Sequence, residues 1–338
     1  MLDCPARRPP GGWRGFREAT RSMDLRAHYA GRTVLVTGAG GFIGSHLAEA
    51  LLGLGARVRL LDRRAPAAGG APAGAEILTR SLAEGPPLDD AVDGCDGIFH
   101  LAGNASPALS TREPERDFAD NVVATQRLAD AWRRRGAGGF VFASSALVYG
   151  EPQRPLIDED HPLRPGLPYA GAKLACEVLL ESYARCWDLD LRRVRLFNTF
   201  GPRQRAYVLF DLLEKLRRDP RRLEILGTGA QRRAYNYVSD TVQALLCVGA
   251  HPAARGGVYN VGGDRPVTIL ELADLLIDAI GIARPEVACT GQSWPGDVAT
   301  LVGDTARLRG LGYAPAVGFA EGLRRMVAWH REEFAPPW

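Results

Sequence analysis

The stretch RTVLVTGAGGFIGSHLAEALLGLGARVRLLDRR, residues 32–64, decides the fold of this 338-residue chain. Residues 32–36 are predicted to form a short apolar strand, which a glycine-rich turn connects to an amphipathic helix that ends at residues 53–55. The segment RVRLLD, residues 57–62, is predicted to be a second strand. A strand, a turn, a helix and another strand in this order are typical of a parallel α/β sheet.

The turn in this stretch has the composition of a dinucleotide-binding site. Gly38, Gly41 and Gly44 are spaced G-x-x-G-x-x-G between the strand and the helix. Glycines let the backbone approach a pyrophosphate, and a helix N-terminus presents free N–H groups and the positive end of the helix dipole to it. Asp62 ends the second strand, about 20 residues later, where a carboxylate accepts hydrogen bonds from an adenosine ribose. The stretch therefore predicts dinucleotide binding.

The alternation of strands and helices continues beyond this unit. Apolar strand patterns at residues 97–103, 139–150 and 189–201 alternate with helical patterns that include residues 121–136 and the helix around residue 169. We expect an α/β fold, a Rossmann-type doubly wound parallel sheet covered on both faces, with a smaller C-terminal α/β substrate-binding domain. The expected bounds are a disordered leader at 1–30, an NAD-binding domain at 31–200 with a return segment at about 235–263, and a cap at 201–234 and 264–338.

Composition excludes several other classes of protein. The chain is 46% hydrophobic and 24% charged with a net charge of +3, which is typical of a soluble globular protein. The arginine-rich stretches are short and interrupted, so nucleic-acid binding is not predicted. No apolar run approaches the ~20 residues of a membrane helix, and the first residues lack the pattern of a signal peptide. The six cysteines show no metal-ligand spacing, so we expect a cytoplasmic chain with reduced thiols and no metal.

The segment PYAGAKLACE, residues 168–177, suggests the reacting groups. Tyr169 and Lys173 lie one helical turn apart on one face, and an ammonium beside a phenol favours the phenolate. Ser144 and Ser145 follow a predicted strand, at the sheet edge where ligands bind in such folds. We predict that Tyr169 exchanges a proton with a substrate hydroxyl and that Ser145 hydrogen-bonds the same oxygen. Lys173 is predicted to lower the pKa of Tyr169 and to hold a ribose.

Motifs along the chain resemble those of one enzyme family. They are TGAGGFIGSHL, FHLAG, ASSALVYG, YAGAK, RLFNTFGPRQ, GTGAQRRAYNYVSD, YNVGGDRPVTILELA and WPGDV. Together they resemble the extended short-chain dehydrogenase/reductases, specifically the NAD-dependent nucleotide-sugar epimerase/dehydratase family, over about residues 31–330. The resemblance implies NAD as cofactor, a nucleotide-diphosphate sugar such as a UDP-sugar as substrate, and a homodimer. The dimer helices would be those around 118–134 and 169–187, where the apolar residues are Leu128, Trp132, Leu174, Leu179 and Leu180.

The resemblance also implies which residues contact the ligands. The NAD contacts would be Gly38, Gly41, Phe42, Ile43, Gly44, Asp62, Arg63, Ser81, Leu82, Leu101, Ala102, Gly103, Asn121, Tyr169 and Lys173. The substrate contacts would be Ser144, Ser145, Asn198, Arg233 and Asp297. Arg233 would grip the diphosphate, since a guanidinium suits phosphate oxygens. Asn198 would touch the diphosphate or the sugar, and Asp297 the nucleotide ribose or a neighbouring loop. Asp62 favours NAD over NADP, because it would repel a ribose 2′-phosphate, whereas Arg63 and Arg64, which follow it, could accommodate that phosphate.

The chain departs from the family pattern at three places. Ala146 and Leu147 stand where sugar dehydratases carry Asp-Glu and uronate decarboxylases carry Ser-Glu. Trp294 stands where many UDP-sugar epimerases have a diphosphate-binding arginine, and Ser81 where the family usually has an aspartate at the adenine. The diphosphate clamp and the adenine pocket are therefore expected to differ from those of the relatives.

The predicted activity is that of a nucleotide-sugar 4-epimerase similar to UDP-glucose 4-epimerase. Tyr169 would take the proton of the sugar O4 as C4 passes a hydride to NAD, and the hydride would return to the other face of the ketone. This reaction needs one acid/base residue and no second carboxylate, in agreement with Ala146 and Leu147. UDP-glucuronate decarboxylation, reduction of a nucleotide-4-ketosugar and non-catalytic NAD sensing stay open as alternatives.

Overall fold

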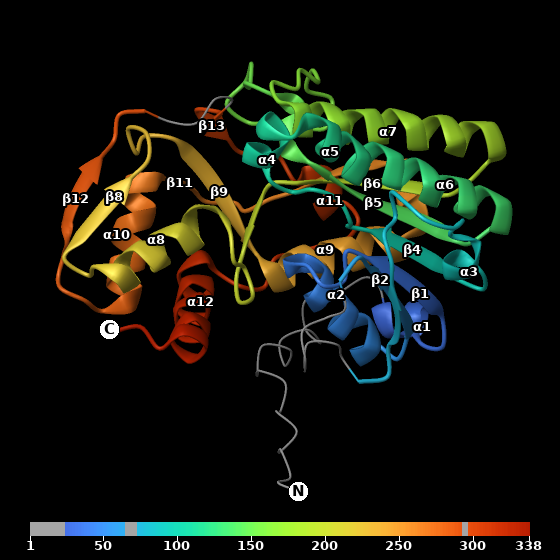
Figure 1. Ribbon diagram of the computed structural model, residues 1–338, viewed down its shortest axis with the longest axis horizontal. Helices are drawn as coiled ribbons and strands as arrows, with labels where there is room; N and C mark the ends of the chain where they lie inside the picture. Colours follow the sequence, from blue (N-terminus) through green and yellow to red (C-terminus); the bar gives the residue numbers. More distant parts are fainter. Residues whose placement is uncertain (1–23, 65–72, 293–296) are drawn as a thin grey trace, which may run out of the picture.

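A twisted parallel sheet forms the centre of the larger lobe of the protein (Figure 1). The computed structural model describes residues 24–64, 73–292 and 297–338. The strand order is β10-β6-β5-β4-β1-β2-β3, and each neighbouring pair is parallel. The bounds are β1 (Thr33–Thr37), β2 (Arg57–Asp62), β3 (Glu76–Thr79), β4 (Gly97–His100), β5 (Gly139–Ser145), β6 (Leu191–Leu196) and β10 (Val258–Val261). The doubly wound Rossmann-type fold is confirmed.

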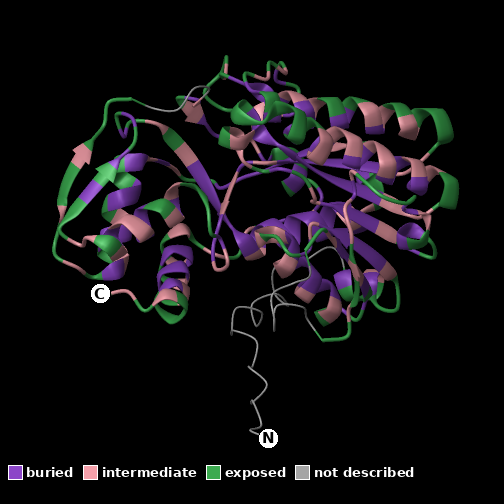
Figure 2. Ribbon diagram, viewed as in Figure 1, coloured by how far each residue is buried: buried purple, intermediate pink, exposed green. Residues whose placement is uncertain are grey.

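Helices cover both faces of this sheet, which explains why the residues of the inner strands β1 and β5 are almost all buried (Figure 2). One face is covered by α3 (Asp89–Val92), α6 (Ala124–Arg135) and α7 (Pro168–Trp187). The other is covered by α1 (Leu25–Tyr29), α2 (Phe42–Gly53) and α9 (Val238–Ala250). Strand β1 pairs with β2 on one side and β4 on the other. The chain therefore reverses its direction of winding at β1, and a crevice for a ligand opens beyond the carboxyl ends of β1 and β4.

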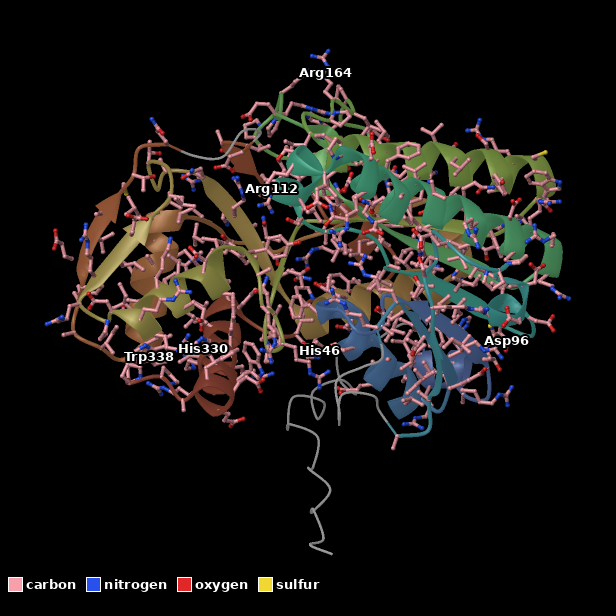
Figure 3. The ribbon with its side chains drawn as sticks, in the orientation of Figure 1. His46, Asp96, Arg112, Arg164, His330 and Trp338 are labelled. Atoms are coloured by element: carbon pink, nitrogen blue, oxygen red, sulfur yellow. The ribbon has the colours of Figure 1, made fainter. Side chains whose placement is uncertain are left out.

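The smaller lobe is built around β9 (Arg232–Tyr237). Strand β9 pairs with β7 (Asn198–Phe200), β11 (Pro266–Thr268) and β13 (Thr300–Leu301), while β8 (Arg222–Ile225) pairs with β12 (Glu286–Cys289). Its core also includes residues of α8 (Tyr207–Arg218), α10 (Ile269–Ile280) and α12 (Phe319–Phe334). In Figure 3 the labelled His330 and Trp338 lie in this lobe, and their rings stack at a centroid distance of 5.5 Å. From β9 the chain returns through α9 to β10 of the large sheet.

Short helices complete the connections between strands. They are α4 (Pro107–Arg112), α5 (Pro114–Phe118), the π-helix η2 (Ala119–Val123), the 3₁₀ helices η3 (Ala146–Tyr149) and η4 (Pro252–Ala254), and α11 (Ala306–Arg309). The helices α5, η2 and α6 are consecutive, so one continuous helical segment carries a π-turn in its middle. None of the helices in the described ranges is sufficiently long and apolar to cross a membrane.

The structure corrects the expected extent of the leader. Residues 25–29 form α1, whose residues Leu25 and Tyr29 are buried against the large sheet. The hydroxyl of Tyr29 donates to the carbonyl of Leu246 in α9 over 2.8 Å. Residues 25–29 therefore do not belong to a disordered segment, and the expected bound at residue 30 is wrong. Residues 1–23 lie outside the described residues.

The structure also changes the reasoning for a homodimer. Leu128, Trp132 and Leu180 have no exposed surface, because they fill the core between the sheet and its own helices. They are not available to a second chain. The large apolar side chains that α5 and α7 do expose include Phe118, Val178 and Trp187. The homodimer stays a prediction.

Candidate active site

A cavity of about 780 Å³ extends from the glycine turn to the beginning of α8, along the carboxyl edge of the large sheet. Its walls come from both lobes: the ends of β1, β2, β4 and β5 on one side, and segments near β7, α8 and β9 on the other. All the residues predicted to contact NAD or substrate line this cavity except Asn121 and Asp297. The residues predicted from the sequence therefore lie, with these two exceptions, around one continuous cavity.

The glycine turn leaves no room for side chains at its closest points. Gly38 has a φ of +70°, and a Cβ placed there would lie 2.7 Å from the backbone nitrogen of Ala102. A Cβ at Gly44 would overlap with the carbonyl oxygen of Gly38. Gly41 is the N-cap residue of α2, and no side chain caps that helix. The first N–H groups of α2 therefore meet the cavity without a side chain in front of them, as an anion-binding helix N-terminus requires.

Asp62 closes the turn from the side of β2. Its Oδ2 accepts a hydrogen bond from the backbone N–H of Gly40 over 3.0 Å, and its Oδ1 accepts one from Arg64 over 3.2 Å. The next side chain, Arg63, forms an ion pair of 3.0 Å with Asp120. This arrangement fits a dinucleotide, since a pyrophosphate would bind at the N-terminus of α2 and a ribose at Asp62. The glycines let the turn pack tightly against its neighbours, so that its backbone can approach such a ligand closely.

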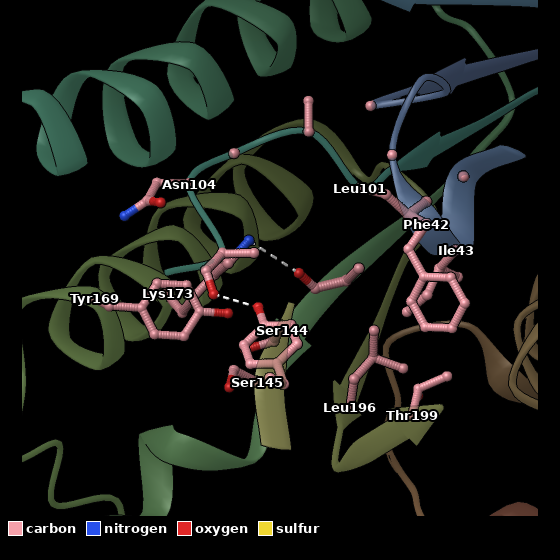
Figure 4. A pocket seen from close by; sticks show the side chains of 18 of the residues that line it. Phe42, Ile43, Leu101, Asn104, Ser144, Ser145, Tyr169, Lys173, Leu196 and Thr199 are labelled. Atoms are coloured by element: carbon pink, nitrogen blue, oxygen red, sulfur yellow. Dashed lines mark hydrogen bonds between the residues drawn. The ribbon is translucent and has the colours of Figure 1, made fainter. Parts of the chain in front are cut away.

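Two neighbouring elements bring the three predicted catalytic residues together. Strand β5 ends at Ser145, and α7 begins at Pro168, so Tyr169 and Lys173 project from its first turns. Tyr169 lies close enough to Ser145 for the serine to lower the pKa of the phenol, and the Nζ of Lys173 donates to the carbonyl of Ala143 over 3.2 Å. In Figure 4 these side chains lie on the opposite side of the pocket from Phe42, Ile43 and Leu101 of the cofactor end.

The expected effect of Lys173 on Tyr169 is not what the structure shows. Burial raises the pKa of Tyr169 well above its usual value, and the bond to Ser145 lowers it by less. Burial also lowers the pKa of Lys173. The prediction of a lowered tyrosine pKa was therefore wrong for the protein chain by itself. The physical reason is that the low dielectric around both groups disfavours both charged forms.

Asn121 and Asp297 do not occupy the predicted positions. Asn121 is buried beneath Gly103, and its Nδ2 donates to the carbonyl and the carboxylate of Asp117. It can support the cavity wall but does not line it. The carboxylate of Asp297 is paired with Arg233 at 2.7 Å and faces a smaller neighbouring pocket. Trp294 stands where many UDP-sugar epimerases have a diphosphate-binding arginine, and it lies outside the described residues.

The substrate end combines polar side chains with apolar walls. Asn198 begins β7, and its buried Nδ2 has no hydrogen-bond partner among the described residues. Arg233 of β9 reaches the cavity and also donates to the carbonyl of Val298 over 2.5 Å. Ala146 and Leu147 line the cavity next to Ser145. An unpartnered amide donor and a guanidinium on one wall suit a ligand rich in oxygen acceptors.

Carboxylates are absent from the middle of the cavity. Among the described residues, its lining contains only Asp62 and Asp120 as acids. Both lie at the glycine-turn end, where Asp62 accepts backbone hydrogen bonds and Asp120 is paired with Arg63. The described lining of the cavity around Tyr169 therefore contains no carboxylate, although the buried Asp117 behind the wall acts electrostatically on Tyr169.

Sequence reasoning missed Tyr207, which lies across the cavity from the large sheet. It is the first residue of α8 and has a φ of +69°, an uncommon value for an aromatic residue. Its hydroxyl donates to the carbonyl of Ala105 in the loop after β4, over 2.5 Å, and thereby joins the two lobes. It also acts electrostatically on Tyr169. No spacing in the sequence indicates this contact, because it depends on how the lobes face one another.

Comparison with known proteins gives consistent results. Residues 34–262 match the model of the NAD dependent epimerase/dehydratase family. A UDP-glucose 4-epimerase of Mycolicibacterium smegmatis is 35% identical over 320 residues, which cover 88% of this chain and 98% of that protein. A dTDP-glucose 4,6-dehydratase of Streptomyces griseus is 34% identical over 311 residues, covering 88% and 94%. The structure of MoeE5 in complex with UDP-glucuronic acid and NAD has a TM-score of 0.82 at 32% identity, covering 89% of this chain and all of that one.

Proposed function

From the premise that this chain belongs to the NAD-dependent epimerase/dehydratase family, we propose that it is a nucleotide-sugar 4-epimerase. Its relatives include both epimerases and dehydratases, so the family alone does not choose between the reactions. The observation that favours epimerisation is the composition of the cavity around Tyr169. Ala146 and Leu147 stand beside Ser145, and the described lining there contains no carboxylate.

The chemistry explains why this composition matters. Dehydration removes a proton from sugar C5 and protonates a hydroxyl that leaves C6, so it needs acid/base groups in addition to the tyrosine. The methyl group of Ala146 and the isobutyl group of Leu147 cannot transfer a proton. Epimerisation at C4 needs one group that accepts the proton of O4 and returns it. Tyr169, whose phenol has its pKa lowered by the neighbouring Ser145, suits that task.

Separate groups of residues would bind the cofactor, transfer the proton and bind the substrate. The helix N-terminus at Gly41 and the carboxylate of Asp62 would hold the cofactor. NAD, when bound, supplies a hydride acceptor that can give the hydride back. The phenol oxygen of Tyr169 would take the O4 proton, and the Ser145 hydroxyl would orient that oxygen. Arg233 and Asn198 would bind the diphosphate, which leaves the sugar ring free to turn between the two hydride transfers.

A positive charge near Tyr169 would complete this site. Burial raises the pKa of the tyrosine, and a cation lowers the pKa of a neighbouring phenol. Tyr169 would therefore be a poor base in the protein chain alone, and NAD, when bound in its oxidised form, would supply a positive charge that favours the phenolate. Proton transfer would then require a loaded enzyme.

The test is product analysis on a panel of UDP-, TDP- and GDP-sugars, including UDP-glucose and UDP-glucuronate, followed by NMR. The expected products are C4 epimers with no accumulation of NADH and no release of carbon dioxide. Tyr169→Phe provides the control for background conversion. A pentose product with stoichiometric carbon dioxide would instead identify a decarboxylase, and a 4-keto-6-deoxy sugar a dehydratase. Either outcome overturns the proposal.

A further inference from the structure

A buried ion pair lies directly behind the candidate active site. Glu177 follows Tyr169 by eight residues and Lys173 by four, so all three side chains leave the same face of α7. The guanidinium of Arg195, on β6, binds the Glu177 carboxylate with two nitrogens: Nη2 lies 2.8 Å from Oε2 and Nε lies 3.1 Å from Oε1. The two side chains are only 3% and 4% exposed. Such a fork-shaped, dehydrated contact fixes both partners in one orientation.

The same carboxylate also holds the strand that carries Ser145. The hydroxyl of Ser144 donates to Oε1 of Glu177 over 2.5 Å. Glu177 therefore touches β5 through Ser144 and β6 through Arg195, while its own helix carries the tyrosine and the lysine. The residues proposed to react all lie on elements that meet at this one side chain.

Further hydrogen bonds connect Arg195 to residues farther from the cavity. Nη1 of Arg195 donates to the hydroxyl of Tyr149 over 2.9 Å and to the carbonyl of Glu159 over 3.1 Å. The Tyr149 hydroxyl in turn donates to Oδ1 of Asn260 in β10 over 2.7 Å. The ion pair is thus anchored to the edge of the sheet and cannot shift by itself.

We propose that Glu177 and Arg195 are positioning residues, which hold Ser145, Tyr169 and Lys173 in the geometry that proton transfer requires. Stability alone is a weak explanation for the pair, because apolar residues of similar volume often replace a buried ion pair without loss. Geometry is the stronger one, since small displacements of reacting groups cost much of the rate. The catalytic part of this proposal rests on the proposed function.

The chain contains its own matched control. One turn further along α7, Glu181 pairs with Arg193 of the same strand β6 at 2.6 Å. This second pair joins the same helix to the same strand, but Glu181 also pairs with Arg185 at the surface and is 32% exposed. Within the described residues it forms no hydrogen bond or ion pair with β5, and it lies farther from Tyr169 along the helix. Glu181→Gln therefore tests what a helix-to-strand ion pair does without a link to Ser144.

The experiment compares Glu177→Gln, Glu181→Gln and the double variant Glu177→Leu/Arg195→Met. The double variant removes both charges and replaces them with apolar groups, so that it folds even where a lone buried guanidinium prevents folding of the single variant. The measurements are Tm, kcat and KM for the sugar that the panel identifies, and the NAD dissociation constant by calorimetry. The double variant is expected to recover the Tm that Glu177→Gln loses, yet to keep a kcat about 10- to 100-fold below that of the wild type.

The expected KM of the double variant is close to that of the wild type, because the substrate end of the cavity is untouched. Glu181→Gln is expected to keep kcat within about twofold. The proposal is wrong if the double variant regains kcat together with Tm, since the pair would then serve folding only. If the wild type converts no sugar of the panel, the proposed function fails. The positioning role is then tested by comparing the NAD dissociation constants of the double variant and Glu181→Gln. Affinity in the double variant equal to that of Glu181→Gln would then overturn it.

Discussion

The two ends of the cavity are built in different ways. The centre of the cofactor end is one continuous piece of chain, β1–α2–β2, and its expected function depends on backbone atoms and on glycines that let the backbone pack closely. The substrate end consists of side chains such as Asn198, Tyr207 and Arg233, which come from separate elements of the smaller lobe and its connections. A site made of local backbone is visible in a sequence pattern, whereas a site made of distant side chains is not.

The largest expected effect is on turnover, from a substitution of Tyr169 between the two ends of the cavity. Tyr169→Phe should lower turnover by at least ~100-fold, the usual scale for removing a general acid/base. NAD affinity and fold should be preserved, because the buried ring stays and only its hydroxyl is lost. Steady-state rates and calorimetry with NAD check this. Near-normal turnover in a folded variant would remove Tyr169 from the mechanism.

The cofactor end can be broken at a single glycine. Gly38→Ala should weaken NAD binding at least about tenfold, since a left-handed φ costs an alanine ~1–2 kcal/mol and the new Cβ also meets Ala102. The control is Gly31→Ala, which has a similar φ of +75° but nothing within 4 Å of the new Cβ. It should lose some stability and keep its NAD affinity. Equal losses of affinity in both variants would show that close approach at the turn is unimportant.

A substitution at the substrate end should weaken substrate binding and leave NAD affinity nearly unchanged. Arg233→Ala should raise the KM for a nucleotide sugar about tenfold, because a hydrogen bond to a charged group contributes roughly 1.5–3 kcal/mol. Its effect on NAD affinity should be small. Arg232→Ala is the matched control, because Arg232 is the exposed neighbour on the same strand and does not line the cavity. An unchanged KM in Arg233→Ala would place the diphosphate elsewhere.

The smallest effect concerns Tyr169 in the absence of cofactor. Because burial raises the pKa of this tyrosine, its phenol should stay neutral as the pH rises through 7 to 10. The absorbance difference near 295 nm between wild type and Tyr169→Phe should therefore remain flat over this range without NAD. A tyrosinate signal that appears near pH 7 would restore the original expectation that Lys173 alone lowers the pKa.

The sequence predicted the nucleotide-binding unit closely. The strand RVRLLD was predicted at residues 57–62 and is β2, and the helix predicted to end at residues 53–55 ends at Gly53. This success has a physical reason: apolar periodicity, glycine placement and a terminal carboxylate are all local properties. Ser145, Tyr169 and Lys173 line the same cavity, as predicted, for a similar reason, since parallel strands end at a common edge; their catalytic roles stay a prediction.

The misses share the opposite cause. Asn121 and Asp297 were placed in the cavity by resemblance, but the packing of η2 beneath Gly103 and the pairing of Asp297 with Arg233 turn them away from it. Tyr207 was not noticed, because its role depends on a contact with Ala105, 102 residues away. The lowered pKa of Tyr169 was predicted from one neighbour, while the burial that reverses it comes from the whole fold.

By itself, the sequence determined the Rossmann-type sheet, the glycine turn, the acid at the end of β2 and the one-turn spacing of Tyr169 and Lys173. Each of these follows from short-range geometry, in which the pattern of residues sets the backbone. Only the tertiary structure decided what surrounds them: the pair of Glu177 with Arg195, the bond of Glu177 to Ser144 and the reach of Tyr207 across the lobes. Burial and charge pairing are set by all the elements packed around a residue, and a linear pattern does not contain that information.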